Sequence, residues 1–244
     1  MSELFDPLRM SLDRLQEAGR TVRIFFRNDD VDRDEGSLGR LLNLFAERAI
    51  PLNLEIIPGL LTESAAVLLR RHHRQFGDLV ELDQHGWLHA NHEPEGRKCE
   101  FGSSRSFDQQ LADLARGRKV LEDAFEEAFS PVFTPPWNRC TTDTYRALDQ
   151  LGFQVLSQRR GRAEIRGYGF REVSVTLDLG RGTRGELVTE LNRQLNDPDP
   201  VGIMLHHKVM DEDAFDFLAL LLDLLRLHRA VNFQTLVRGQ YRER

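Results

Sequence analysis

Two adjacent carboxylates follow the first apolar run of the sequence, where Ile24-Phe25-Phe26 leads into Asp29 and Asp30. Adjacent carboxylates repel each other unless a cation lies near them. A divalent metal would supply that charge, with one carboxylate binding it and the other acting as a base. The alternative is a solvated turn, because Asn-Asp-Asp is also a favourable turn sequence.

Two histidines stand four residues apart in His85-Gly-Trp-Leu-His89. On a helical turn this spacing places both imidazoles on one side, and in a tight loop they can also converge. Two histidines and one carboxylate are a frequent catalytic zinc set with a position open for water. The alternative is a pair of surface histidines. His92 is a third imidazole that could replace one of them, and Asp32 is a further candidate ligand if this set is wrong.

A separate histidine, His206, follows the apolar run Val201 to Leu205. A general acid that works near neutral pH needs a group that titrates there, and histidine is the natural choice. The alternative is a histidine at the rim of the core that only forms a hydrogen bond.

The elements that must position these residues alternate between short apolar runs and amphipathic segments, which predicts strands alternating with helices. Apolar runs predict strands at 22–26, 52–57, 79–82, 132–133, 153–156, 173–179, 201–205 and 230–233. Helical spacing predicts helices at 38–49, 63–76, 106–129, 142–151, 186–195 and 213–227, and Pro131 is expected to end the third of these. Ser106 and Gln109 form an expected capping box, after a long loop over 90–105.

This alternation predicts an α/β protein with a mainly parallel sheet. About seven units in 244 residues fit a single-domain distorted (β/α) barrel over 1–244, with its core at about 21–238. A doubly wound open sheet is the alternative. In a parallel barrel the carboxyl ends of the strands share one face, where active sites are built. The aspartates and histidines described above follow strand ends, so we expect them to converge there.

The charge and the cysteine spacing exclude some classes of protein function. Lys and Arg number 33 against 39 Asp and Glu, giving a net charge of -6, so nucleic-acid binding through a general basic surface is not expected. Cys99 and Cys140 lack metal-binding spacing. Neither a secretory signal nor a membrane span is visible, and a cytoplasmic protein is expected, compatible with a homo-oligomer. A surface loop is expected at Arg159, Arg160 and Arg162, with anion binding as the lesser alternative.

The sequence resembles the polysaccharide deacetylase (NodB-homology, carbohydrate esterase 4-like) family of metal-dependent carbohydrate esterases. That family has two consecutive aspartates after an apolar strand, two histidines four apart, a proline followed by an aromatic residue, and a strand that ends in Leu-x-His or Leu-Leu-His. The matching segments occur in the family's order and are Phe26-Arg-Asn-Asp-Asp30, His85-Gly-Trp-Leu-His89, Thr134-Pro-Pro-Trp137 and Ile203-Met-Leu-His206.

The resemblance implies a NodB-like distorted barrel that binds one divalent ion, with zinc preferred. It implies that Asp30, His85 and His89 are the metal ligands, that Asp29 is the general base and that His206 is the general acid.

The resemblance also implies a substrate and oxyanion pocket. Trp137 would shape that pocket, with Pro136 and His207 beside it, and Asp178 is a weaker match to an aspartate that orients the acid histidine.

Two positions depart from the family. An arginine that steadies the base usually stands where this chain has Thr134, and an aspartate often stands where it has His207. The expected activity is hydrolysis of an N-acetyl or other N-acyl group from a sugar or small amide. The alternative is a catalytically inactive barrel that binds a carbohydrate or a protein, and a third option is a metal-dependent enzyme acting on an ester or a ring amide.

Overall fold

The computed structural model describes residues 3–159 and 167–237. Arg160 and Arg162, which were expected in a surface loop, lie outside the described residues. The strands are β1 (Val22–Val31), β2 (Leu52–Ile56), β3 (Val80–His85), β4 (Phe129–Thr134), β5 (Val155–Arg159), β6 (Arg171–Val175), β7 (Leu177–Asp178), β8 (Val201–Leu205) and β9 (Val231–Phe233). The helices are α1 (Asp6–Glu17), α2 (Ser37–Ala46), α3 (Glu63–Phe76), α4 (Phe107–Phe125), α5 (Thr142–Gln150), α6 (Arg184–Gln194) and α7 (Glu212–Leu227).

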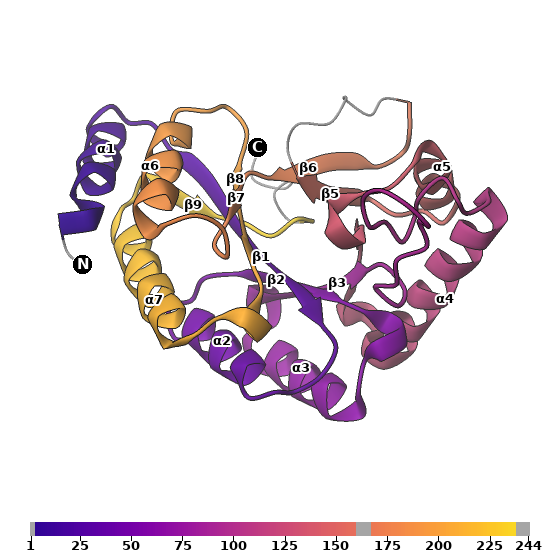
Figure 1. Cartoon of the computed structure of the whole chain (residues 1–244). Coiled ribbons are helices and arrows are strands. Elements are labelled where there is room, and N and C mark those ends of the chain that lie inside the picture. The colour runs from indigo at the N-terminus through magenta and orange to yellow at the C-terminus, as the bar shows by residue number, and fades with distance from the viewer. Residues whose placement is uncertain (1–2, 160–166, 238–244) are drawn as a thin grey trace.

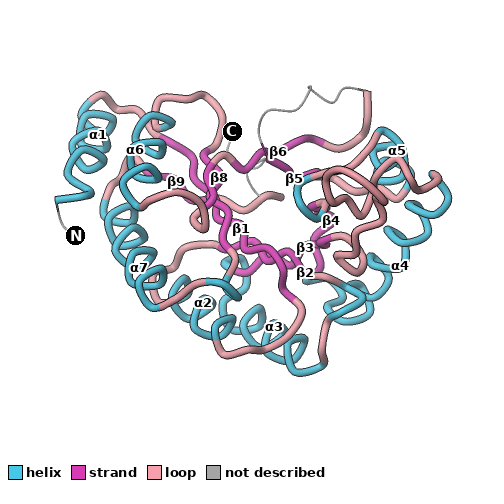
Figure 2. The backbone as a smooth tube through the Cα atoms, viewed as in Figure 1, coloured by secondary structure: helices cyan, strands magenta, loops and turns pink. Residues whose placement is uncertain are grey.

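The strands form one sheet that curves into a nearly closed barrel with the helices outside it (Figures 1 and 2). The strand order is β6-β5-β4-β3-β2-β1-β8-β7, β9 also pairs with β1, and the pairings among the described strands are parallel. This confirms the predicted distorted (β/α) barrel over the open doubly wound sheet.

The strand expected at 173–179 is divided in the structure. Its first part, β6, pairs with β5, whereas its second part, β7, pairs with β8 at the other end of the strand order. One continuous stretch of chain therefore contacts both edges of the sheet and brings them together. Thr176, between the two parts, donates its backbone N–H to Gly202 of β8 at 2.9 Å.

The helices pack their apolar sides on the outer face of the barrel. The capping box at the start of α4 is confirmed, because Ser106 N–H donates to Gln109 Oε1 at 2.9 Å and Gln109 N–H donates to Ser106 Oγ at 3.3 Å. The predicted end of this helix was wrong, since α4 stops at Phe125 and β4 already begins at Phe129. Pro131 lies within that strand rather than at a helix end.

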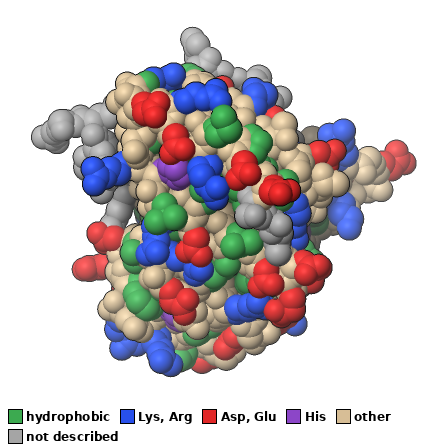
Figure 3. Space-filling model, turned by 90° about the vertical axis from the view of Figure 1, so that its left-hand side faces the viewer, with side chains coloured by type: hydrophobic (Ala, Val, Ile, Leu, Met, Phe, Trp, Pro, Cys, Tyr) green, Lys and Arg blue, Asp and Glu red, His purple; other side chains and the backbone are tan. Residues whose placement is uncertain are grey.

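Helix α1 was not predicted from the sequence. Its buried Leu8, Leu12 and Leu15 recur at helical spacing and join the main core between the helices and the barrel. On the side of the molecule that carries α1, basic and acidic side chains alternate and hydrophobic ones are scattered among them (Figure 3). Within the described residues, no helix is both long enough and apolar enough to cross a membrane.

The interior of the barrel holds an apolar cluster around Phe25 and Met204 and, beside it, buried acidic side chains. Glu55 on β2 and Glu81 and Asp83 on β3 are all buried, and burial raises the pKa of Glu55 to about 8 and that of Glu81 to about 7. The segment after β9 packs against these strands. Leu236 N–H donates to Asn53 Oδ1 at 2.8 Å, and Val237 N–H donates to Glu81 Oε1 at 3.1 Å.

Candidate functional site

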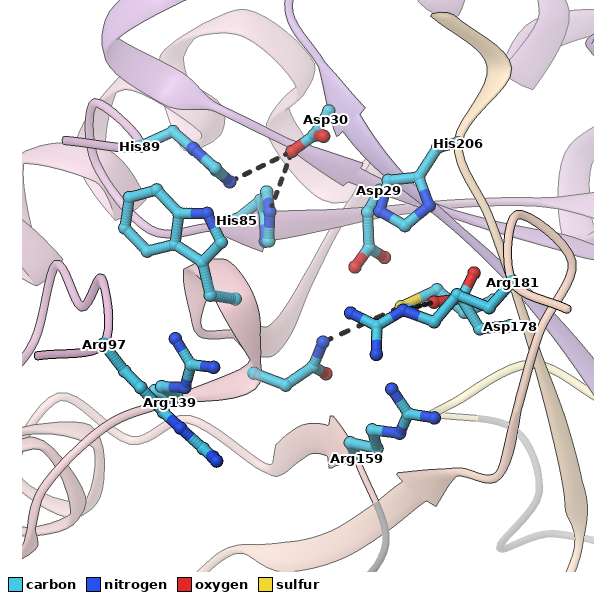
Figure 4. A pocket seen from close by; sticks show the side chains of 13 residues that line it. Asp29, Asp30, His85, His89, Arg97, Arg139, Arg159, Asp178, Arg181 and His206 are labelled. Atoms are coloured by element: carbon cyan, nitrogen blue, oxygen red, sulfur yellow. Dashed lines mark hydrogen bonds and ion pairs between the residues drawn. The ribbon is translucent and has the colours of Figure 1, made fainter. Parts of the chain in front are cut away.

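A cavity of about 400 Å³ opens at the carboxyl ends of the strands and gathers residues from most of the length of the chain (Figure 4). Its size is in the range of small-molecule sites. The side chains that line it are Asp29, Asp30, His85, His89, Arg97, Trp137, Asn138, Arg139, Arg159, Asp178, Arg181, Met204 and His206. Seven of the nine site residues expected from the sequence are therefore brought together here, and Pro136 and His207 are not.

A bulge in β1 lets two consecutive aspartates face the same cavity. Side chains normally alternate between the two faces of a strand, so Asp29 and Asp30 would point apart in a regular one. The pairing of β1 with β2 shifts register between Asn28 and Val31, and Asp30 has a φ of 67°. This left-handed conformation redirects one aspartate without removing the other from the cavity.

Backbone strain is concentrated around the cavity. Among the described residues, six non-glycine residues have positive φ, and four of them line the site: Asp30, His89, Trp137 and Asn138. Such conformations cost about 1–3 kcal/mol each and persist only where the surrounding structure enforces them. Their gathering at one cavity makes it the candidate functional site of the fold.

Asp30, His85 and His89 form a three-ligand cluster. Asp30 Oδ1 lies 3.2 Å from Nε2 of His85 and 3.2 Å from Nε2 of His89, and the potential ligand atoms of the three residues all lie within 4.8 Å of one another. Asp30 Oδ1 is buried and has no hydrogen-bond donor among the described residues. A buried carboxylate oxygen that meets two imidazole nitrogens fits a zinc-type cation, which takes such ligands at about 2.0–2.2 Å.

A second contact orients one of these imidazoles for metal binding. His85 Nδ1 lies 3.0 Å from the backbone carbonyl of Thr134, which can only accept a hydrogen bond. Nδ1 therefore carries the proton and Nε2 keeps its lone pair directed at Asp30. Metal-bound histidines commonly use a backbone carbonyl in this way.

The charges of the cluster balance one another. Burial would raise the pKa of Asp30, but the close approach and charge of His85 lower it well below its usual range. Burial would lower the pKa of His85, but the neighbouring carboxylates raise it above its ordinary value. Burial and the adjacent His85 lower the pKa of His89, which favours its neutral, ligand-competent form. The carboxylates thus favour positive charge at this position, which a cation would supply.

The loop that carries His89 is held by a buried glutamate. Glu100 Oε1 accepts from Leu88 N–H at 2.7 Å, and Glu100 Oε2 accepts from Trp87 N–H at 3.2 Å. Gly86 begins this loop with a φ of 61°, and a Cβ there would collide with the Glu100 carboxylate and with Pro136. Only glycine therefore allows the carboxylate to clamp the loop.

Asp29 is bound by a buried arginine that sequence reasoning missed. Arg27 Nε donates to Asp29 Oδ1 at 2.8 Å, and Arg27 Nη2 donates to Asp29 Oδ2 at 2.8 Å. The same guanidinium donates to Ser157 Oγ and to Asn138 Oδ1, each at 2.9 Å. Asp29, the expected base, thus has an arginine partner from its own strand, although Thr134 stands where the resembling family has one. The signal in the sequence was the spacing of two residues on a strand, which places Arg27 and Asp29 on one face.

His206 and Trp137 complete the cavity wall around the cluster of Asp30, His85 and His89. His206 follows β8 and faces the cavity beside Asp29 (Figure 4). The Trp137 ring packs edge to face on His89, with centroids 4.4 Å apart. Asp178 lines the cavity, but its carboxylate accepts from Gly180 N–H at 3.1 Å and pairs with Arg181 Nε at 2.9 Å. No hydrogen bond joins Asp178 to His206 in the described part of the chain, so the expected orienting contact is not seen.

His207 was wrongly placed in the pocket. Its side chain is fully buried on the other side of β8 and forms a hydrogen bond between Nδ1 and Asn28 Nδ2 at 2.9 Å. Burial lowers the pKa of His207 to about 4, so it is neutral at physiological pH. Pro136 is also buried beneath the pocket, against Gly86, because the chain turns there into the short 3-10 helix that presents Trp137.

The alternative ligands lie elsewhere. His92 is exposed in the loop before α4. Asp32 Oδ1 instead pairs with Lys208 Nζ at 2.7 Å. The four cavity arginines were also missed, apart from the suggestion of anion binding at Arg159, because they come from four separate loops or strand ends.

Solved structures share this architecture at low sequence identity. A family 4 acetyl xylan esterase from Clostridium thermocellum, in complex with a cobalt ion, superposes with a TM-score of 0.60 and 17% identity over 88% of each chain. The chain has the fold of the family 4 carbohydrate esterases. A CE4 esterase from Streptococcus mutans matches this fold with a TM-score of 0.61 and 14% identity, over 91% of this chain and 88% of the other.

The same fold also occurs without its usual activity. A family 4 pseudoenzyme from Bacillus anthracis matches with a TM-score of 0.57 and 13% identity, over 88% of this chain and 64% of the other. No protein-family model matches the sequence, and no curated protein does. The likeness therefore establishes the fold, and the activity has to be argued from the site.

Proposed function

We propose that the protein is a metal-dependent hydrolase that removes an N-acetyl or other N-acyl group from a sugar or small amide. The observation that carries this proposal is the convergence of Asp30, His85 and His89 with Asp29 and His206 in one cavity. A cavity of about 400 Å³ suits a small-molecule substrate or the end of a carbohydrate.

The cavity offers a distinct group for each part of amide hydrolysis. A divalent ion held by the cluster, with zinc preferred, would act as a Lewis acid and lower the pKa of water toward about 7. Asp29 accepts the proton of the attacking water, whose oxygen bonds to the carbonyl carbon. His206 donates a proton to the leaving nitrogen as the C–N bond breaks. The products are a carboxylic acid and a free amine.

The orientation of the base favours an enzyme over an inactive barrel. A bidentate guanidinium holds both oxygens of Asp29 in place. The missing arginine at Thr134 therefore does not leave the base without a cation. Each carboxylate oxygen accepts one hydrogen bond from Arg27 at 2.8 Å and keeps a further lone pair with which it can accept from a water.

Metal content and turnover test the proposal separately. Elemental analysis should find about one divalent ion in the purified protein and its loss in Asp30→Ala and in His89→Ala. Asp29→Asn should keep the metal and lose turnover by about 10²-fold or more, the usual scale for a general base. Turnover is measured as acetate release from N-acetyl and O-acetyl compounds. Metal retention in both ligand variants would overturn the site, and bound metal without acetate release from any compound would favour the inactive barrel.

A further inference from the structure

Four arginines line the cavity, although the chain as a whole has a net charge of -6. They come from four places: the loop after β3, the turn after β4, the end of β5 and the turn after β7. They are Arg97, Arg139, Arg159 and Arg181. The same cavity holds three aspartates, two of which belong to the reacting centre, so positive charge outweighs negative charge even before a divalent ion is counted.

Two of these arginines are fixed in place. Arg139 Nη1 donates to the backbone carbonyl of Lys98 at 2.8 Å. Arg181 Nε pairs with the buried Asp178 carboxylate at 2.9 Å. The Asp178 carboxylate, which has no hydrogen bond to His206 in the described part of the chain, thus serves to hold an arginine at the cavity.

Among the residues that the structure describes, the other two have no acidic partner. Arg97 and Arg159 are exposed, and neither makes an ion pair or side-chain hydrogen bond within the described residues. Cations gathered at one cavity repel one another unless an anion lies between them.

Three of the four arginines lie to one side of the reacting centre, and Arg181 lies apart from them beside Asp178 (Figure 4). In Figure 4, Arg97, Arg139 and Arg159 occupy the side of the cavity away from Asp30 and His89. A ligand that spans the cavity can therefore place its acyl group at the metal ligands and another group at the guanidinium side chains. The planar guanidinium fork matches the oxygens of phosphate and carboxylate groups in a bidentate manner.

We infer that the substrate is anionic, with a phosphate or carboxylate group that Arg97, Arg139 and Arg159 bind while its acylated nitrogen faces His206. The inference rests on the proposed function for the reacting end of the substrate. The anion site itself rests only on the arginines. On this inference, the enzyme selects its substrate by the negative charge of the substrate and not by the length of a neutral glycan chain.

Direct binding of small anions tests the arginine site without any turnover. Inorganic phosphate and acetate are titrated calorimetrically into the zinc-loaded protein, into Arg97→Met and Arg159→Met, and into the matched control Arg74→Met. Arg74 is exposed near the end of α3, which follows β2 and runs back toward the opposite end of the barrel. Each cavity variant should weaken phosphate or acetate binding by roughly 10-fold, since a charge-assisted hydrogen bond is lost, and the control should not.

A substrate series distinguishes the two anion sources and separates this inference from the proposed function. Acetate release is compared for N-acetylglucosamine, its 1-phosphate and 6-phosphate, and N-acetylmuramic acid, which carries a carboxylate. One anionic compound should exceed the neutral sugar by about 100-fold in kcat/KM, and Arg159→Met should remove most of that advantage. Equal kcat/KM values and anion binding unchanged in both variants would overturn the anionic substrate but not the hydrolase. Arginine-dependent anion binding without acetate release would support the anion site and overturn the hydrolase.

Discussion

Replacing Arg27 with methionine should destabilise the protein by roughly 3–5 kcal/mol, the usual cost of removing one partner of a buried ion pair. The side chains of Arg27 and Asp29 are 0% and 3% exposed, so water cannot replace the lost contact. Methionine keeps much of the aliphatic bulk but leaves the Asp29 carboxylate buried without a cation. Ser157 and Asn138 each lose a hydrogen-bond donor as well.

Urea unfolding of Arg27→Met, Asp29→Asn and the double variant measures the coupling between the two residues. The double variant should be more stable than the sum of the single losses predicts, by about 2 kcal/mol, because it leaves no unpaired buried charge. Additive losses, or a loss below about 1 kcal/mol for Arg27→Met, would refute the reasoning. Arg27→Lys should recover only part of the stability, because an ammonium group cannot form the bidentate contact.

Further predictions concern His206, the loop that carries His89, and Glu81 inside the barrel. His206→Ala should reduce kcat/KM for an amide far more than for an activated aryl ester, whose phenolate leaves without a proton; steady-state kinetics that show equal losses would reject the acid role. Gly86→Ala should weaken zinc binding in a metal titration by displacing the His89 loop, whereas Gly39→Ala, with open space around its Cα on α2, should not. Glu81→Gln should have little effect on the unfolding free energy at pH 4 and stabilise the protein at pH 8. Burial raises the pKa of Glu81 from 4.5 to about 7, so the wild-type protein loses stability as pH rises through that range; a difference that does not grow with pH would contradict this account.

The barrel and most of the cavity could be predicted because both depend on local patterns. Apolar runs alternate with amphipathic ones, and the polar residues that follow parallel strands must share one end of the barrel. His85 and His206 follow this rule directly. The strand register also explains why only one member of the His206-His207 pair reaches the cavity, since neighbouring side chains point to opposite faces.

The remaining features depend on tertiary contacts that short patterns do not reveal. No periodicity predicts that Asp30 adopts a left-handed conformation, because the bulge arises from the pairing of β1 with β2. The clamp from Glu100 depends on a loop that folds back over 12–13 residues. The division of the strand at 173–179 reflects closure of the whole barrel, which only the assembled sheet imposes.

The segment after β9, which donates hydrogen bonds to Asn53 and Glu81, bears on how the chain reaches its native state. Asn53 and Leu236 are 183 residues apart in sequence, and Asn28 and His207 are 179 apart. During synthesis from the ribosome, β1, β2 and β3 emerge long before β8 and this segment can complete their buried hydrogen bonds. Until then, the early strands lack these hydrogen-bond partners and have unpaired sheet edges. This slows folding and exposes the nascent chain to misassociation. We expect chaperone assistance and slow refolding to matter more for this protein than its modest length suggests.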